Sequence, residues 1–161
     1  WECISGWGHS PEHMALYSSS ANVLISGDMV LPKISTNVSV YAQEPEANAL
    51  ALFMRSLKKF DVLPSDTLVL PSHGRPFKGL HTRTAQLLQH HEERMQEVLD
   101  ACRETPGSAH DMLKVIFKRP LDFHQTTFAI GESVAHLHAL WLAGKMHRTK
   151  DAEGIWRFKT V

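Results

Sequence analysis

The chain has 161 residues, enough to form one domain or two small ones and to bury a sizeable core. Its 17 basic and 17 acidic residues cancel, so no overall electric field recruits nucleic acid or an anionic membrane. No apolar run approaches the roughly 20 residues that span a bilayer. The two cysteines, Cys3 and Cys102, suggest neither a disulfide framework nor a thiolate zinc site. We therefore expect a cytoplasmic protein that contacts no membrane.

A β-hairpin is predicted near the start of the chain, after a short strand or loop at residues 1–8. Two apolar runs, at 14–20 and 23–26, are parted by the turn-forming residues around Ser20-Ala21-Asn22. His9 lies before the first of these strands and Asp28 after the second. Because the strands of a hairpin run antiparallel, we expect His9 and Asp28 to be neighbours at one end of it.

A strand–helix–strand crossover is predicted to follow. Residues 46–60 carry apolar side chains at helical spacing behind an acidic, proline-containing start, which indicates a helix that covers a sheet. A buried-type strand at 67–70 then leads to His73. Since such crossovers usually join parallel strands, we expect His73 to return to the edge that carries the histidine and aspartate of the hairpin.

Two further features lie close to this edge in the sequence. The loop at 29–43 either contributes substrate contacts, for which Asn37 and Tyr41 are candidates, or simply crosses the surface. His13 stands four residues after His9, a spacing that pairs two ligands on a helix, but the intervening proline argues against a helix there. We therefore expect His13 to support a metal ligand from behind or to face the substrate, and not to bind metal itself.

Two imidazoles and one carboxylate thus meet at one edge of the predicted sheet. His9, Asp28 and His73 offer the nitrogen and oxygen donors that zinc binds at roughly 2.0–2.2 Å in proteins. Each motif alone is weak, because a Gly-Asp after a strand or a Ser-His-Gly more often forms a turn or a loop. The convergence of three separate motifs is what predicts a metal site.

A long helix and a linker come next. Residues 80–102 have apolar positions at helical spacing, and His90 and His91 are adjacent within them. Neighbouring helical positions point about 100° apart, so these two histidines are not expected to bind one metal. Residues 104–108 contain Pro and Gly and predict a boundary. The expected domains are a partial catalytic domain at 1–79, a connecting helix and linker at 80–105, and a third region at 106–161.

The third region is predicted to be a small winged helix. Ser108 caps a helix that ends near Phe117, and a second short segment holds Phe123 and Phe128. A third helix follows over 130–141, and strands at 145–149 and 155–161 form the wing.

A winged helix raises the question of nucleic-acid binding. The third helix presents no arginine, and its two histidines, His136 and His138, point to different sides, so neither base reading nor a shared metal is expected there. Lys145, Arg148 and Lys150 in the wing allow at most nonspecific phosphate contact. Packing against the catalytic domain is the default role of this region.

The motifs Gly8-His9-Ser10, Ser26-Gly27-Asp28 and Pro71-Ser72-His73-Gly74, with the order of the strands, resemble the metallo-β-lactamase superfamily. The resemblance implies an α/β (α+β) fold, namely the C-terminal half of the αββα sandwich followed by a winged-helix tail, which Gly131–Leu137 also resembles. It further implies that Asp28 is the catalytic carboxylate that bridges two zinc ions, or two ions of iron or manganese, while His9 holds one ion and His73 the other.

The branch that the chain resembles hydrolyses thioesters and related esters through metal-bound hydroxide, or cuts nucleic acids. The family's His-x-His-x-Asp-His cluster does not occur in these residues. We therefore expect a C-terminal fragment that is inactive alone, that needs the missing N-terminal half as a partner and that self-associates through an uncovered sheet. The alternative function is a nucleic-acid-binding or nuclease-accessory module that acts through the winged-helix tail.

Overall fold

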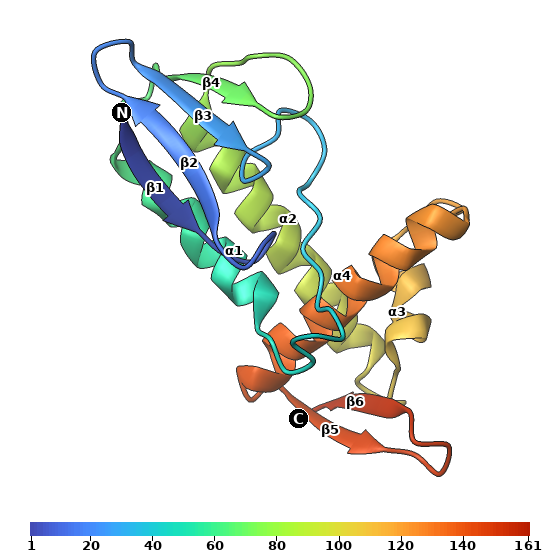
Figure 1. Cartoon of the computed structure of the whole chain (residues 1–161). Helices are drawn as coiled ribbons and strands as arrows, with labels where there is room; N and C mark the ends of the chain where they lie inside the picture. The colour runs from blue at the N-terminus through green and yellow to red at the C-terminus, as the bar shows by residue number, and fades with distance from the viewer. The chain divides into compact units, whose positions relative to one another are not determined.

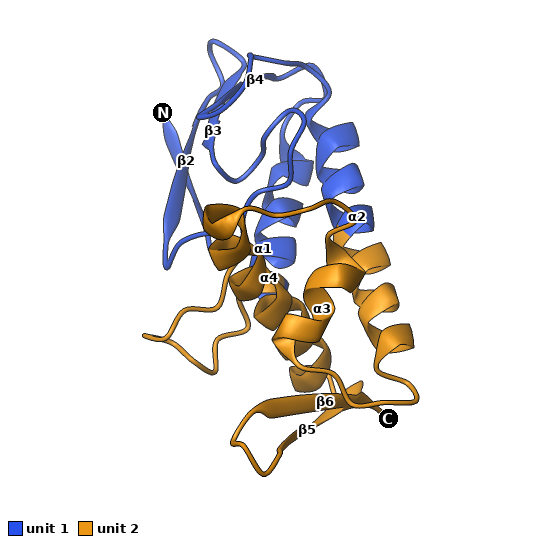
Figure 2. Cartoon of the chain, turned by 90° about the vertical axis from the view of Figure 1, so that its right-hand side faces the viewer, with its two compact units in different colours: residues 1–38, 51–90 blue, residues 39–50, 91–161 orange.

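The computed structural model describes all 161 residues and divides them into two compact units. Unit 1 comprises residues 1–38 and 51–90, and unit 2 comprises residues 39–50 and 91–161 (Figure 2). The chain is mixed α and β, as predicted. None of its helices is both long enough and apolar enough to cross a membrane.

Unit 1 is built on a four-stranded sheet with the order β1-β2-β3-β4 (Figure 1). The strands are β1 (Glu2–Gly6), β2 (His13–Ser18), β3 (Val23–Gly27) and β4 (Leu68–Pro71). Strands β1, β2 and β3 pair antiparallel, and Asn22 makes the β2–β3 turn with a positive φ of 49°. Strand β4 pairs parallel to β3. The predicted hairpin and the predicted crossover are both confirmed.

Two helices follow the expected pattern with different bounds. Helix α1 (Ala49–Leu57) continues as a 3-10 helix, η1 (Lys58–Val62), and helix α2 (Leu80–Ala101) matches its predicted span closely. The expected start of the first helix, at residue 46, was wrong because residues 44–47 form a separate turn, in which the Ala47 N–H donates to the Glu44 carbonyl. Phe53 and Leu57 of α1 are fully buried, as the helical stripe predicted.

The sheet of unit 1 has one buried and one partly open face. In Figure 1 the helical segments of unit 1, α1 and the first part of α2, lie behind the strands, on a single side of the sheet. Ala15, Tyr17 and Leu24 point to the buried side, whereas Met14 and Ile25 on the other side are 46% and 38% exposed. Alternation of this kind is what a half-covered sheet requires. The open apolar face is consistent with self-association, which stays a prediction.

Unit 2 contains two capped helices, α3 (Ala109–Ile116) and α4 (Phe123–Leu142). Ser108 and Asp111 form a capping box at α3, which confirms the predicted cap. The two segments expected between 120 and 141 are in fact one helix, α4, which starts at the Asp122 cap. Gly131 lies within it without interrupting it, and a Cβ at this position would lie 2.6 Å from the Ser39 Oγ.

The predicted C-terminal hairpin is also present in unit 2. It consists of β5 (Met146–Lys150) and β6 (Trp156–Thr160), which pair antiparallel. Phe158 of β6 is buried in a core with residues from α2, α3 and α4, and its backbone pairs with Gly107. The core members are Val98, Cys102, Met112, Ile116, Leu137, Leu140, Met146 and Phe158. The element order is therefore as expected, while the winged-helix assignment and the boundary at 105 stay predictions.

Candidate metal centre

The C-terminal ends of two parallel strands create the candidate site in unit 1. Strand β3 ends at Gly27 and β4 at Pro71, and these two residues are partners in the parallel register. Asp28 and the Ser72-His73 pair therefore leave the sheet at the same edge, and the arrowheads of β3 and β4 in Figure 1 point the same way. His9 reaches this edge from the turn between β1 and β2. The predicted convergence of the three motifs is confirmed as geometry.

Asp28 stands between the two histidines. Its Oδ2 lies 3.3 Å from the Nε2 of His9, and its Oδ1 lies 3.5 Å from the Nε2 of His73. The Ser72 hydroxyl also donates to Oδ1. The His73 side chain is 69% exposed, whereas those of His9 and Asp28 are each 28% exposed. Each carboxylate oxygen thus faces a different imidazole, and one side of the arrangement is open to solvent.

The orientation of the His9 ring is set by a backbone carbonyl. Its Nδ1 lies 2.8 Å from the carbonyl oxygen of Asn37, which can only accept a hydrogen bond. Nδ1 therefore carries the proton, and Nε2 presents a lone pair toward Asp28. Metal-binding histidines are commonly held in this manner. The backbone of Asn37 thus positions His9, and substrate contact by its side chain stays a prediction.

His13 supports the backbone under Asp28. Its Nε2 accepts the Asp28 N–H at 3.3 Å, and its ring packs against Gly27, where a Cβ would lie 2.3 Å from Nε2. Gly27 has a φ of +53°, which favours glycine. The pKa of His13 is lowered from its ordinary value, chiefly by burial and further by the charge of His9. A neutral ring is the form that can accept this hydrogen bond.

Hydrogen bonds to Asp28 and to helix α2 hold the loop that follows β3. The Thr36 hydroxyl donates to the backbone carbonyl of Asp28. Arg83 of α2 donates from Nε to the Leu31 carbonyl at 2.6 Å and from Nη2 to the Ile34 carbonyl at 2.8 Å. Sequence reasoning missed Arg83 because the contact spans about 50 residues along the chain, whereas Ser72, beside His73, carried a local signal.

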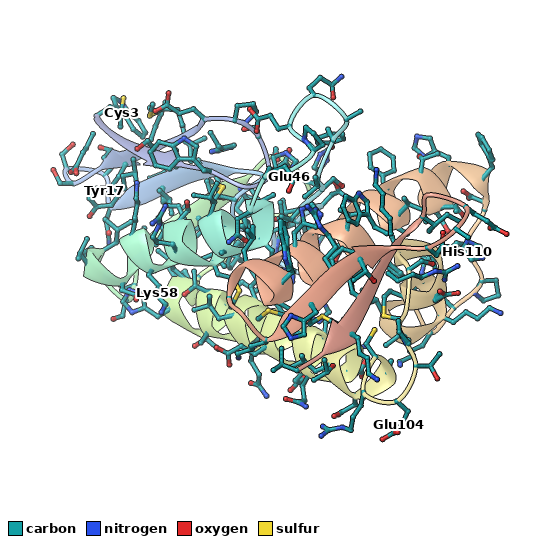
Figure 3. The ribbon with its side chains drawn as sticks, turned by 90° about the horizontal axis from the view of Figure 1, so that it is seen from below. Cys3, Tyr17, Glu46, Lys58, Glu104 and His110 are labelled. Carbon is teal, nitrogen blue, oxygen red and sulfur yellow. The ribbon has the colours of Figure 1, made fainter.

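In unit 2 the side chain of Arg148, on strand β5, is in contact with other side chains. The Arg148 guanidinium stacks 3.6 Å from the Trp141 ring centroid and 4.0 Å from that of Trp156. It also pairs with Glu46, labelled in Figure 3, at 2.9 Å, and its side chain is only 10% exposed. These contacts give Arg148 a packing role. Phosphate contact by Lys145, Arg148 and Lys150 gains no support from this arrangement and stays a prediction.

The two cysteines are free. Cys3, labelled on β1 in Figure 3, is exposed, and Cys102 is buried in the core of unit 2. Burial raises the pKa of the Cys102 thiol. A buried thiol of this kind acts as a small apolar side chain.

Comparison with known proteins places these motifs in a family context. Residues 95–161 match the family model described as "Metallo-beta-lactamase-like, C-terminal domain". Over 144 residues the chain is 24% identical to the "Probable metallo-hydrolase YqjP" of Bacillus subtilis (strain 168), covering 87% of this chain and 44% of that protein.

Two solved structures share the fold along essentially the whole chain. A beta-lactamase domain protein from Burkholderia ambifaria is 54% identical with a TM-score of 0.97, over 100% of this chain and 48% of that one. The metallo-beta-lactamase family protein TTHA1429 from Thermus thermophilus is 28% identical with a TM-score of 0.85, over 99% of this chain and 49% of that one. The chain thus spans about half the length of these relatives. It belongs to the metallo-β-lactamase superfamily and corresponds to the C-terminal part of its members.

Proposed function

We propose that His9, Asp28 and His73 form part of the divalent metal centre of a hydrolase, with Asp28 as the carboxylate shared by two ions. One observation carries this proposal, namely that each oxygen of Asp28 faces the Nε2 of a different histidine. A carboxylate that bridges two ions through both of its oxygens has them directed at separate positions in this way. The similarity to a metallo-hydrolase supports the same reaction class.

The residues of the edge fit such a metal. Imidazole nitrogen and carboxylate oxygen suit zinc, and they also suit iron and manganese. The tautomer of His9 leaves its Nε2 lone pair directed at the site, and the exposed face of His73 leaves room for a substrate. When bound, a divalent ion lowers the pKa of a water molecule and polarises a carbonyl, so that hydrolysis proceeds at neutral pH.

Neighbouring side chains of this chain hold Asp28 in position. Ser72 donates to Oδ1 of Asp28, while Thr36 and His13 hold the backbone on either side of its side chain. A catalytic carboxylate fixed at three points keeps its direction when a substrate enters. The substrate we propose is a thioester or a related ester, on the resemblance of the motifs around His9 and His73.

The number of donors limits what these residues do by themselves. A catalytic zinc normally has three protein ligands, and three side chains divided between two ions provide at most two for each. We therefore propose that further ligands from outside these 161 residues complete the centre. The chain alone is expected to hold metal weakly at this edge of the sheet and to be inactive.

Removal and replacement of the metal, combined with a substrate panel, tests the proposal. The longer protein that contains this chain is treated with a chelator and reloaded with zinc, iron or manganese. We expect hydrolysis of a thioester to vanish with the chelator and to return with one of the ions, at a rate well above that for a β-lactam or a phosphodiester. Unchanged hydrolysis after complete metal removal would sink the proposal, and preference for the phosphodiester would replace the substrate class.

Arg83 gives a prediction about the loop that orients the site. Arg83→Met keeps much of the aliphatic length but removes both bonds to the Leu31 and Ile34 carbonyls. The loop that carries Thr36 and Asn37 should then loosen, and both Asp28 and His9 lose orientation. We expect metal affinity to fall about 10- to 100-fold while the fold is kept, as measured by metal titration and circular dichroism.

The matched control for Arg83 is Arg75, an exposed arginine of the same unit. Arg75→Met removes the same charge and should leave metal affinity unchanged. An equal loss in the two variants would mean that charge, and not the tether to the loop, explains the effect.

A further inference from the structure

Unit 2 contains a cluster of buried polar side chains that the edge site does not use. His91 of α2 and His136 of α4 are both fully buried, and Glu132 of α4 is 7% exposed. His91 Nδ1 lies 3.3 Å from His136 Nε2. A ring nitrogen of His91 and a carboxylate oxygen of Glu132 lie within 4.8 Å of each other. Two imidazoles and a carboxylate thus meet inside a helical core.

The tautomers of this cluster follow from one hydrogen bond. His136 Nδ1 lies 2.8 Å from the backbone carbonyl of Glu132, which can only accept. Nδ1 of His136 therefore carries a proton, and its Nε2 presents a lone pair to His91. A carbonyl that fixes one ring nitrogen and leaves the other available is the arrangement commonly found behind metal-binding histidines.

The carboxylate of Glu132 lacks compensation for its burial. Burial alone raises the pKa of Glu132 to about 7, since no neighbouring cation or hydrogen bond contributes to the shift. Buried carboxylates are usually paired or bind a metal.

We propose that His91, His136 and Glu132 form a second metal site, separate from the edge, that takes a divalent transition ion such as zinc. The 3.3 Å between the two ring nitrogens matches the spacing of about 3.3 Å between neighbouring ligands of a tetrahedral zinc with bonds of roughly 2.0–2.1 Å. The ion takes the place of the proton between His91 Nδ1 and His136 Nε2, and that proton moves to the Nε2 of His91, so that each neutral ring keeps one proton. A proton held by Glu132 is released to solvent, and its carboxylate offsets part of the charge of the ion. Glu132 closes the remaining distance by rotation of its flexible side chain.

The sequence indicates the pairing of Glu132 with His136 but not the contribution of His91. Glu132 and His136 are four residues apart, which puts them on one face of a helix. His91 comes from a different helix, 45 residues earlier in the chain. Spacing arguments compared His91 with its neighbour His90, and His136 with His138, and did not consider a pair made from both helices. The pair that forms joins one member of each.

Cobalt binding in a chain without the edge carboxylate tests this site. The full chain with Asp28→Ala is stripped of metal and titrated with cobalt(II), whose visible absorption reports four-coordinate geometry. We expect one tightly bound equivalent and a higher Tm with cobalt than without it. Adding His136→Gln should weaken cobalt binding at least about 100-fold. No cobalt absorption in the folded Asp28→Ala chain would overturn the proposal.

Two further variants keep the test decisive. His138→Gln alters a buried histidine two positions away, whose Nδ1 lies 3.3 Å from the Ala47 carbonyl, and it should leave cobalt binding unchanged. Glu132→Gln keeps the shape of the side chain and removes its charge, so it should fold at least as well without metal and still lose cobalt. Unchanged cobalt affinity in either Glu132→Gln or His136→Gln would contradict the site. Because the edge site is measured with Asp28 intact, failure here leaves the proposed hydrolase function untouched.

Discussion

Replacing Asp28 by Ala is expected to lower hydrolysis by the longer protein at least about a thousandfold and to remove most of the metal bound at the sheet edge. The carboxylate is the only group of this chain that pairs with both His9 and His73 in the structure. Its loss would remove a ligand from each of the two proposed ions at once, and no other carboxylate pairs with both histidines. Turnover and metal content, measured on the same preparation, check the expectation.

The control for this substitution is Asp61→Ala, which removes an exposed carboxylate from η1 in the same unit. It should leave both quantities unchanged. His73→Ala should cost nearly as much hydrolysis as Asp28→Ala, since it removes one ligand of one ion. Wild-type turnover and metal content in either the Asp28 or the His73 variant would remove the basis of the metal assignment.

Gly27→Ala is expected to lower the free energy of unfolding by about 2–4 kcal/mol and to reduce metal binding with it. The new Cβ would lie 2.3 Å from the Nε2 of His13, so the imidazole must move away. The hydrogen bond from the Asp28 N–H is then lost, and the backbone that aims Asp28 is no longer held. Denaturant unfolding and metal titration of the same variant measure the two effects.

Gly79 provides a control, because its φ is also positive but a Cβ at this position would contact no other atom. Its φ is +93°, and nothing lies within 4 Å of a Cβ built there. Gly79→Ala should therefore cost only the backbone strain, about 1–2 kcal/mol, and leave metal binding intact. If the two variants behave alike, the contact with His13 is not the reason for glycine at position 27.

The edge of the sheet was predictable because its determinants are local and periodic. The alternation in β2 and β3 fixes a hairpin, and the helical stripe of α1 fixes a crossover, so topology alone brings Asp28 and His73 together. Ser20 to Asn22 supplied the turn signal, and Asn22 indeed has a positive φ. Recognition of His9, Asp28 and His73 needed no knowledge of their side-chain contacts.

The remaining features depend on contacts between distant residues. Arg83 reaches carbonyls about 50 positions earlier, and His91 meets His136, which no periodic pattern encodes. Helix α4 continues through Gly131 despite the low helical propensity of glycine, and Ser39, 92 positions earlier in the chain, approaches too closely for a Cβ there. Arg148, which the sequence offered for nonspecific phosphate contact, lies against two tryptophan rings and pairs with Glu46.

The most direct measurement of the central claim is an anomalous difference map from crystals of the longer protein grown with zinc. We predict two zinc peaks beside Asp28, both within bonding distance of its carboxylate, one of them also bonded to the Nε2 of His9 and the other to the Nε2 of His73. The hydrogen bond from His9 to the Asn37 carbonyl should be retained in the loaded state. Zinc found only elsewhere, with His9 and His73 still in direct contact with Asp28, would contradict the assignment of this edge as the metal centre.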